Sequence, residues 1–121
     1  MTKKTNSKQY DLEERTFRFA QRVRDFVKKL PKTLANIEDC VQLVDASGSV
    51  GANYIEANEA LSKKDFVYRI KICRKESKES RYWLRLVDTN GEPSLEQERK
   101  ELIQEATELM KIFGSIVTKN E

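Results

Sequence analysis

The sequence predicts an all-α protein, an up-down-up-down antiparallel four-helix bundle. Apolar residues recur every three or four positions through four segments, which is the periodicity of helices that bury one side. The 121 residues include only four Gly and two Pro, and 36% are charged, which favours helices over strands and turns. The length suits one domain. We expect a disordered tail over residues 1–9 and a bundle domain over residues 10–119.

The first helix is expected over about residues 11–30. Pro31 marks its end, because the residue before a proline avoids helical geometry. One apolar stripe follows the helix at spacings of four and three and is expected to face the core. Its members are Leu12, Thr16, Phe19, Val23, Phe26 and Leu30.

The second helix is expected to bury a stripe that carries two glycines. A glycine inside a helix costs about 1 kcal/mol relative to alanine. We therefore expect another backbone to approach closely at Gly48 and Gly51. The alternative is a break at Gly48 into two shorter helices. The stripe consists of Leu34, Ile37, Val41, Val44, Gly48, Gly51 and Ile55.

Capping boxes mark the expected starts of the third and fourth helices. Ser62 is followed by Asp65, and Ser94 by Gln97, at the spacing that satisfies free amides of a first turn. Between them, Asn90-Gly91 is a turn signal. The predicted buried stripes are Phe66, Ile70, Cys73, Ser77, Ser80, Leu84 and Val87 on the third helix and Leu95, Arg99, Leu102, Ala106, Leu109, Phe113 and Ile116 on the fourth.

The second helix has another apolar stripe beside the first one. It comprises Leu43, Ser47, Val50, Tyr54, Ala57 and Leu61. No Lys or Arg occurs between residues 33 and 61. One explanation is a wide core stripe. The other is a self-association surface, because contiguous exposed apolar surface usually marks an interface. We predict an oligomer interface formed by Leu43, Val50, Tyr54, Ile72 and Trp83.

Charge alternates along the chain, with basic first and third helices and acidic second and fourth helices. The first and fourth helices are neighbours in this topology, so we expect their opposite charges to pair. Exposed pairs contribute about 0–1 kcal/mol each. The predicted partners are Arg15, Arg18, Arg22 and Lys29 on one side and Glu98, Glu101, Glu105 and Glu108 on the other.

The third helix carries a row of cations on the side turned away from its apolar stripe. We call Lys64, Lys71, Lys75, Lys78 and Arg85 the basic stripe, with Tyr82 alongside. Like charges three and four residues apart repel each other, and an anionic partner relieves that repulsion. The stripe therefore predicts a nucleic-acid-binding site in which Tyr82 stacks on a base. A solvated cationic surface and an acidic protein partner are the alternatives.

The composition argues against an enzyme. The chain has no histidine, and it lacks a Gly-rich phosphate loop, a nucleophile motif and a Cys-based metal pattern. We expect no metal and no cofactor. Cys40 and Cys73 are expected to be free thiols. The polar start of the sequence is unlike a signal peptide, and no apolar run is long enough for a membrane span, so we expect a cytoplasmic protein without membrane contact.

The chain resembles the bacterial four-helix bundle proteins encoded in intervening sequences of 23S rRNA genes. The resemblance runs from "YDLEERTFRFAQRVRDFVKKLP" onward and is most specific in "SGSVGANYIEANEALSKKDF" and "RIKICRKESKESRYWLRL". It implies the same bundle, no catalysis and a ring-shaped homo-oligomer, a pentamer. The accessory protein of diversity-generating retroelements is similar, which implies RNA or DNA and a reverse transcriptase as partners.

The family's motif positions fall on Ser49, Asn53, Glu56 and Glu79. We interpret them as a hydrogen-bond cluster between helices or subunits. Asp45 stands where the family often has a basic residue, and Ala57 replaces a common glycine. The functional hypothesis is a homo-oligomer that binds nucleic acid through the third helix. The alternative is a protein-interaction scaffold that forms a ring and has no nucleic-acid ligand.

Overall fold

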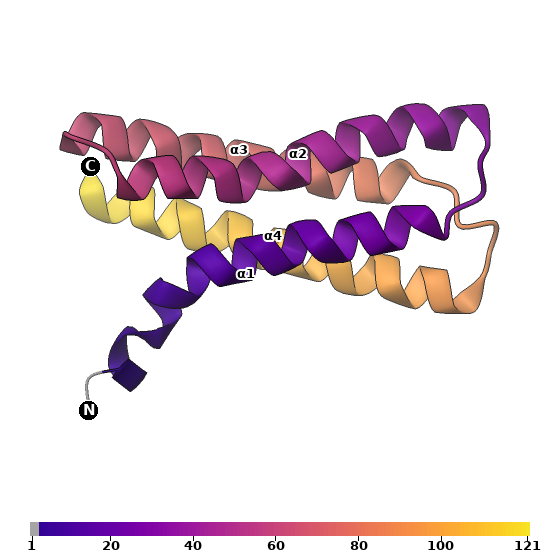
Figure 1. The fold of residues 1–121 in the computed structure, drawn as a ribbon, viewed down its shortest axis with the longest axis horizontal. Helices are drawn as coiled ribbons and strands as arrows, with labels where there is room; N and C mark the ends of the chain where they lie inside the picture. Colours follow the sequence, from indigo (N-terminus) through magenta and orange to yellow (C-terminus); the bar gives the residue numbers. More distant parts are fainter. Residues whose placement is uncertain (1–2) are drawn as a thin grey trace.

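Four helices follow one another in antiparallel order in the computed structural model, which describes the backbone of residues 3–121 and the side chains of residues 12–121 (Figure 1). They are α1 (Lys3–Lys28), α2 (Leu34–Asn58), α3 (Lys63–Leu86) and α4 (Pro93–Asn120). Helix α1 packs against α2 and α4, and α3 completes the bundle by packing against α2 and α4. The predicted four-helix bundle is confirmed. No helix in the described part of the chain is long and apolar enough to cross a membrane.

Helix α1 begins earlier than predicted. Its backbone is helical from Lys3, although the apolar pattern predicted a start near residue 11. Lysine and glutamine in this segment are good helix formers, so the helix continues without a break. Its amino-terminal end diverges from the other three helices (Figure 1). The side chains before Leu12 lie outside the described residues, and the division into a disordered tail (1–9) and a domain (10–119) stays a prediction.

The core is built from one apolar stripe per helix. The stripes predicted for α1 and α3 are buried, apart from the half-buried Phe66. On α4, Val117 is buried where Ile116 was predicted, and Ile116 is half-buried. The fully buried large side chains of this core include Phe19, Phe26, Ile70, Leu84, Leu102, Leu109 and Phe113.

Helix α2 buries the other of its two apolar stripes. Leu43, Val50 and Tyr54, predicted as interface residues, lie in the core with at most 7% of their surface exposed. Leu34 and Val41, predicted as core, are 79% and 62% exposed. Both stripes have helical spacing, so periodicity alone does not rank them. The middle of the predicted stripe is two glycines, which offer no side chain to a core.

The two glycines meet α1, and α2 is continuous through both. A Cβ added at Gly51 would lie 3.0 Å from Thr16 Oγ1 and 3.3 Å from Thr16 Cβ. A Cβ added at Gly48 would lie 3.2 Å from the guanidinium of Arg24. The predicted approach of another backbone is confirmed at Gly51, where the backbone carbon of Thr16 lies 3.7 Å from the added Cβ, and is wrong at Gly48, where the three nearest atoms belong to the Arg24 side chain. Thr16 itself is fully buried, and its hydroxyl donates to the carbonyl oxygen of Leu12 at 2.7 Å.

Salt bridges join α1 to α4 as predicted. Arg15 contacts Glu105 and Glu108 at 2.7 Å each. The other two bridges connect Arg22 with Glu101 and Lys29 with Glu98. Arg18 departs from the prediction, because it pairs with Glu14 of its own helix at 3.1 Å. Most of the basic row of α1 is therefore occupied by α4.

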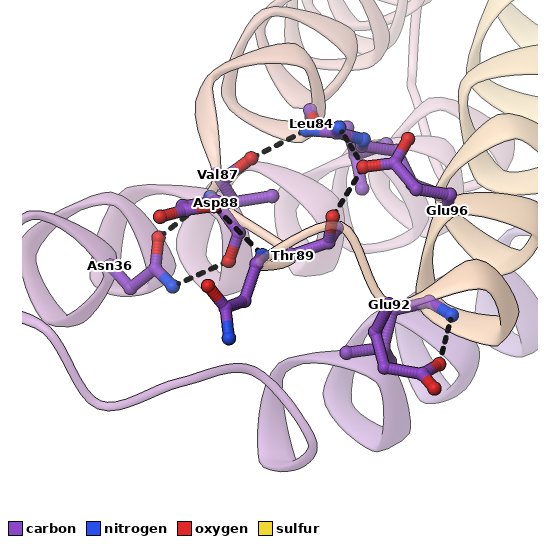
Figure 2. Close-up of polar contacts among 10 residues, drawn as sticks. Asn36, Leu84, Val87, Asp88, Thr89, Glu92 and Glu96 are labelled. Carbon is purple, nitrogen blue, oxygen red and sulfur yellow. Dashed lines mark hydrogen bonds and ion pairs between the residues drawn. The ribbon is translucent and has the colours of Figure 1, made fainter.

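The helix starts differ in how they are capped. Ser62 Oγ accepts from the backbone N–H of Asp65 at 3.1 Å, which confirms the capping position predicted for α3. The predicted Ser94 cap of α4 is wrong. Glu92 caps this helix and accepts from the backbone N–H of Ser94 at 2.9 Å, with Pro93 in the first turn (Figure 2). Proline suits that position, because its missing N–H would have no partner there.

A buried asparagine ties the α3–α4 connection to the start of α2 (Figure 2). Asn36 Nδ2 donates to the carbonyl oxygens of Pro31 and Asp88 at 2.9 and 2.8 Å, and its Oδ1 accepts from the Asp88 N–H at 2.9 Å. Arg99 of α4 donates to the carbonyl oxygen of Val87, at the start of the same connection. Asn90 and Gly91 follow with positive φ angles of 58° and 71°, as the turn signal predicted.

We expect Gly51→Ala and Gly48→Ala to change stability in opposite directions. The new methyl at position 51 meets a buried, hydrogen-bonded Thr16, so the free energy of unfolding should fall by about 1–3 kcal/mol. At position 48 the neighbour is the flexible end of Arg24, so the gain in helix propensity should prevail, at about 0.5–1 kcal/mol. Urea unfolding followed by circular dichroism measures both. Equal losses in both variants would contradict this account of the α1–α2 contact.

Candidate functional site

The basic stripe lies on the outer surface of α3. All its five cations and Tyr82 are exposed, as predicted. Tyr68 completes the row and is 60% exposed. Tyr68 was not among the predicted site residues, although it obeys the same alternation of three and four positions. In order, the row is Lys64, Tyr68, Lys71, Lys75, Lys78, Tyr82 and Arg85.

The stripe retains free positive charge. Lys71 pairs with Glu121 at 3.1 Å, and Lys75 lies 3.8 Å from Glu76. Within the described part of the chain, the other three cations of the stripe have no carboxylate within 4.0 Å; these are Lys64, Lys78 and Arg85. The stripe therefore differs from the basic row of α1, in which Arg15, Arg22 and Lys29 pair with carboxylates of α4.

Each exposed tyrosine of the row contacts the residue that follows it. The rings of Tyr82 and Trp83 meet edge to face, with centroids 5.0 Å apart. The guanidinium of Arg69 lies 5.8 Å from the centroid of the Tyr68 ring. Trp83 is half-buried against the core, so it is a fixed neighbour for Tyr82. These contacts restrict both rings, and more than half of the surface of each tyrosine stays exposed.

Asn53 connects α2 to this row. Its Oδ1 accepts from Arg69 Nη1 at 2.9 Å, and its Nδ2 donates to the carbonyl oxygen of Ser49 at 2.9 Å. Asn53 thereby holds the guanidinium that lies over Tyr68. The other two motif positions, Glu56 and Glu79, are exposed on α2 and α3. The hydrogen bonds join two of the four family-motif residues, Ser49 and Asn53.

The outward stripe of α2 forms a second candidate surface together with α1. We call this surface the outer apolar face; its exposed members are Phe17, Leu34, Ile37, Val41 and Ile55. A groove of about 780 Å³ runs along it between the two helices. The apolar residues of the groove include Val27, Leu30, Pro31, Ile37, Cys40, Val41 and Val44. Of the predicted interface residues, Ile72 and Trp83 are half-buried on α3 and do not line this groove.

The groove has charges of opposite sign on its two sides. Arg24, Lys28 and Lys32 line it from the α1 side, and Asp45 lines it from α2. Glu38 is exposed seven residues before Asp45, on the same side of α2. The outer apolar face therefore has one basic border and one acidic border.

Burial affects the thiols and one carboxylate of the described residues. Among the described residues, no group of three or more His, Cys, Asp or Glu could hold a metal ion. Both cysteines are free, as predicted. Burial raises the pKa of Cys73 to about 12, so this thiol stays protonated. Burial also raises the pKa of Glu76, and the charges of Glu79 and Asp45 raise it further while Lys75 lowers it.

Comparison with known proteins identifies the family. The family model described as 23S rRNA-intervening sequence protein matches residues 8–115. The chain belongs to this family. A similar solved structure is the crystal structure of a protein with unknown function from the S23 ribosomal protein family of Bacteroides thetaiotaomicron. It is 28% identical, covers 88% of this chain and 97% of its own, and superposes with a TM-score of 0.76. No curated protein matches the sequence.

We expect Glu76→Gln to stabilise this family member increasingly as pH rises. A carboxyl group whose pKa is raised by folding supports the fold fully below its unfolded pKa, and this support is lost as pH rises through the folded pKa. The glutamine amide of the variant does not ionise, so the variant avoids this loss of stability. The difference in unfolding free energy between variant and wild type should therefore grow from pH 4 to pH 8 in urea titrations.

Glu96→Gln provides a control of opposite sign. Hydrogen bonds from Thr89 and Arg99 hold the pKa of Glu96 below its usual range. The contribution of Glu96 to stability is therefore present above its unfolded pKa and is lost on acidification. This variant should lose stability relative to wild type as pH rises from 3 to 7. A Glu76→Gln difference that is independent of pH would show that Glu76 ionises as freely in the folded state as in the unfolded state.

Proposed function

We propose that this member of the 23S rRNA-intervening sequence family is a non-enzymatic homo-oligomer that binds RNA or DNA through the basic stripe of α3. The observation that carries the proposal is the contrast between the two basic helices. Arg15, Arg22 and Lys29 of α1 pair with carboxylates of α4. In contrast, Lys64, Lys78 and Arg85 of α3 have no carboxylate partner among the described residues. Phosphates would relieve their mutual repulsion and release counterions on binding.

The proposed oligomer uses the outer apolar face. Its partner is a second copy of this chain, because a single surface carries both the basic and the acidic border. Arg24 and Lys28 of one copy would meet Glu38 and Asp45 of the next while the apolar residues between them leave water. Exposed apolar side chains gathered beside a groove are the usual mark of an interface.

A protein-interaction scaffold without a nucleic-acid ligand is the second candidate function. The outer apolar face favours it, because this surface suits a protein partner whether or not α3 binds phosphate. Under this alternative the basic stripe is a solvated surface. Binding measurements on α3 variants separate the two functions, and the purified protein's absorbance ratio at 260 and 280 nm gives a first indication.

We expect wild-type protein to bind a labelled structured RNA or a duplex DNA, with an affinity that falls steeply with salt. Changing Lys71, Lys75 and Lys78 together to Glu should weaken binding at least about tenfold. The slope of log K against log salt should flatten by about three, one for each lost phosphate contact. Fluorescence anisotropy across a salt series measures both quantities.

The matched control changes three exposed lysines of α4 to Glu, namely Lys100, Lys111 and Lys119. This variant has the same net charge as the α3 variant, so a loss of nucleic-acid affinity caused by net charge alone would appear in both variants. Binding that survives the α4 changes and disappears after the α3 changes supports the stripe as the binding surface. No binding by wild type even at low salt would overturn the nucleic-acid function and leave the scaffold.

We expect Val41→Lys to reduce the oligomer to single chains or smaller assemblies. Val41 is 62% exposed in one chain, so the fold tolerates the lysine, but a charge at the centre of a buried interface is strongly unfavourable. Light scattering coupled to size exclusion measures the mass. Leu61→Lys is the control, because Leu61 is 97% exposed and absent from the groove. A wild-type mass equal to one chain would contradict the oligomer.

A further inference from the structure

Two exposed tyrosines share the row of the basic stripe. Tyr68 is 60% exposed and Tyr82 is 53% exposed. They are separated by 14 residues, or about 21 Å at the helical rise of about 1.5 Å per residue. The cations between them in the row are Lys71, Lys75 and Lys78. The surface therefore places two aromatic rings at the ends of a short run of positive charge.

The chain itself orients both rings. The rings of Trp83 and Tyr82 pack edge to face, with centroids 5.0 Å apart. The Arg69 guanidinium lies over Tyr68, and Asn53 of α2 holds this guanidinium by a 2.9 Å hydrogen bond. A side chain that is already restricted loses less rotamer entropy when a ligand binds, which favours binding. Asn53 is thus a positioning residue for Tyr68.

Resting on the proposed nucleic-acid function, we infer that the ligand of α3 is a single strand whose bases stack on Tyr68 and Tyr82. The lysines between the rings contact the phosphates. At about 3.4 Å per stacked nucleotide, the distance of about 21 Å spans about six nucleotides. A base inside a duplex has both of its faces covered by neighbouring bases. Only an unpaired base can use the rings, whereas phosphate contacts alone do not distinguish single strands from duplexes.

The experiment compares single strands with duplexes on the same protein. Labelled mixed-sequence oligonucleotides of 4, 8 and 12 residues, in RNA and DNA form, are titrated beside the 12-residue duplex by anisotropy. We expect affinity to rise steeply from 4 to 8 residues, where the strand first reaches both rings, and to exceed that for the duplex at least about tenfold. A preference for RNA or for DNA supports the inference in either case and identifies the sugar that is recognised.

Substitutions test the role of the rings. Tyr68→Leu and Tyr82→Leu should each weaken single-strand binding about 5- to 100-fold and leave duplex binding unchanged. Tyr68→Phe and Tyr82→Phe keep an aromatic face, so they should retain single-strand binding. Both positions are exposed, so the leucine variants are expected to fold, and circular dichroism checks this.

Asn53→Ala tests the positioning role. It should weaken single-strand binding when Tyr68 is present and have no further effect in the Tyr68→Leu background, because the two residues act through one ring. A purely structural role of Asn53 would lower affinity equally in both backgrounds and would overturn this part of the inference.

The outcomes separate this inference from the proposed function. Equal binding of single strands and duplexes, with both leucine variants unaffected, overturns the single-strand inference and leaves phosphate binding by the stripe intact. No binding of any oligonucleotide at low salt overturns the proposed function and this inference with it.

Discussion

The burial of Leu43, Val50 and Tyr54 against the other helices determines the surfaces of this bundle. Their burial turns one side of α2 toward the core. The positions of the residues on its other sides follow from that rotation of the helix. The small residues of the same side, such as Ala46 and Ser47, are also buried. The same orientation leaves Ile37 and Val41 beside α1 and aims Asn53 at Arg69 of α3.

Charge supports the same orientation. Glu38, Asp45 and Glu56 follow one another along α2 on a side that lies nearer to the outward stripe than to the buried one. Burying the outward stripe would draw these carboxylates toward the core, where desolvation disfavours charge. The orientation found in the structure leaves Glu38, Asp45 and Glu56 exposed instead. Both apolar stripes have the helical period, and the carboxylates beside the outward stripe favour burial of the other one.

The distribution of ion pairs divides the basic residues into two classes. Arg15, Arg22 and Lys29 contact carboxylates of α4, and these contacts specify which helix lies beside α1 more than they add stability. The basic stripe lies on α3, away from the α1–α2 groove. An assembly built on the outer apolar face would leave the stripe of each copy accessible. Several stripes on one oligomer would bind a long strand more tightly than one stripe alone.

Spacing along the chain was enough to predict the four helices, three of the four buried stripes, the turn at Asn90-Gly91 and most of the α1–α4 salt bridges. Each of these depends on local spacing or on the order of neighbouring helices, both of which can be read from a linear chain. Which stripe of α2 is buried could not be predicted in this way, because both stripes have the helical period and the choice depends on the side chains that the other helices place against α2. The tertiary structure also decided that Asn53 meets Arg69 beside Tyr68. That contact joins two helices at one point, and helical spacing places residues on a side of one helix without specifying their partner on another.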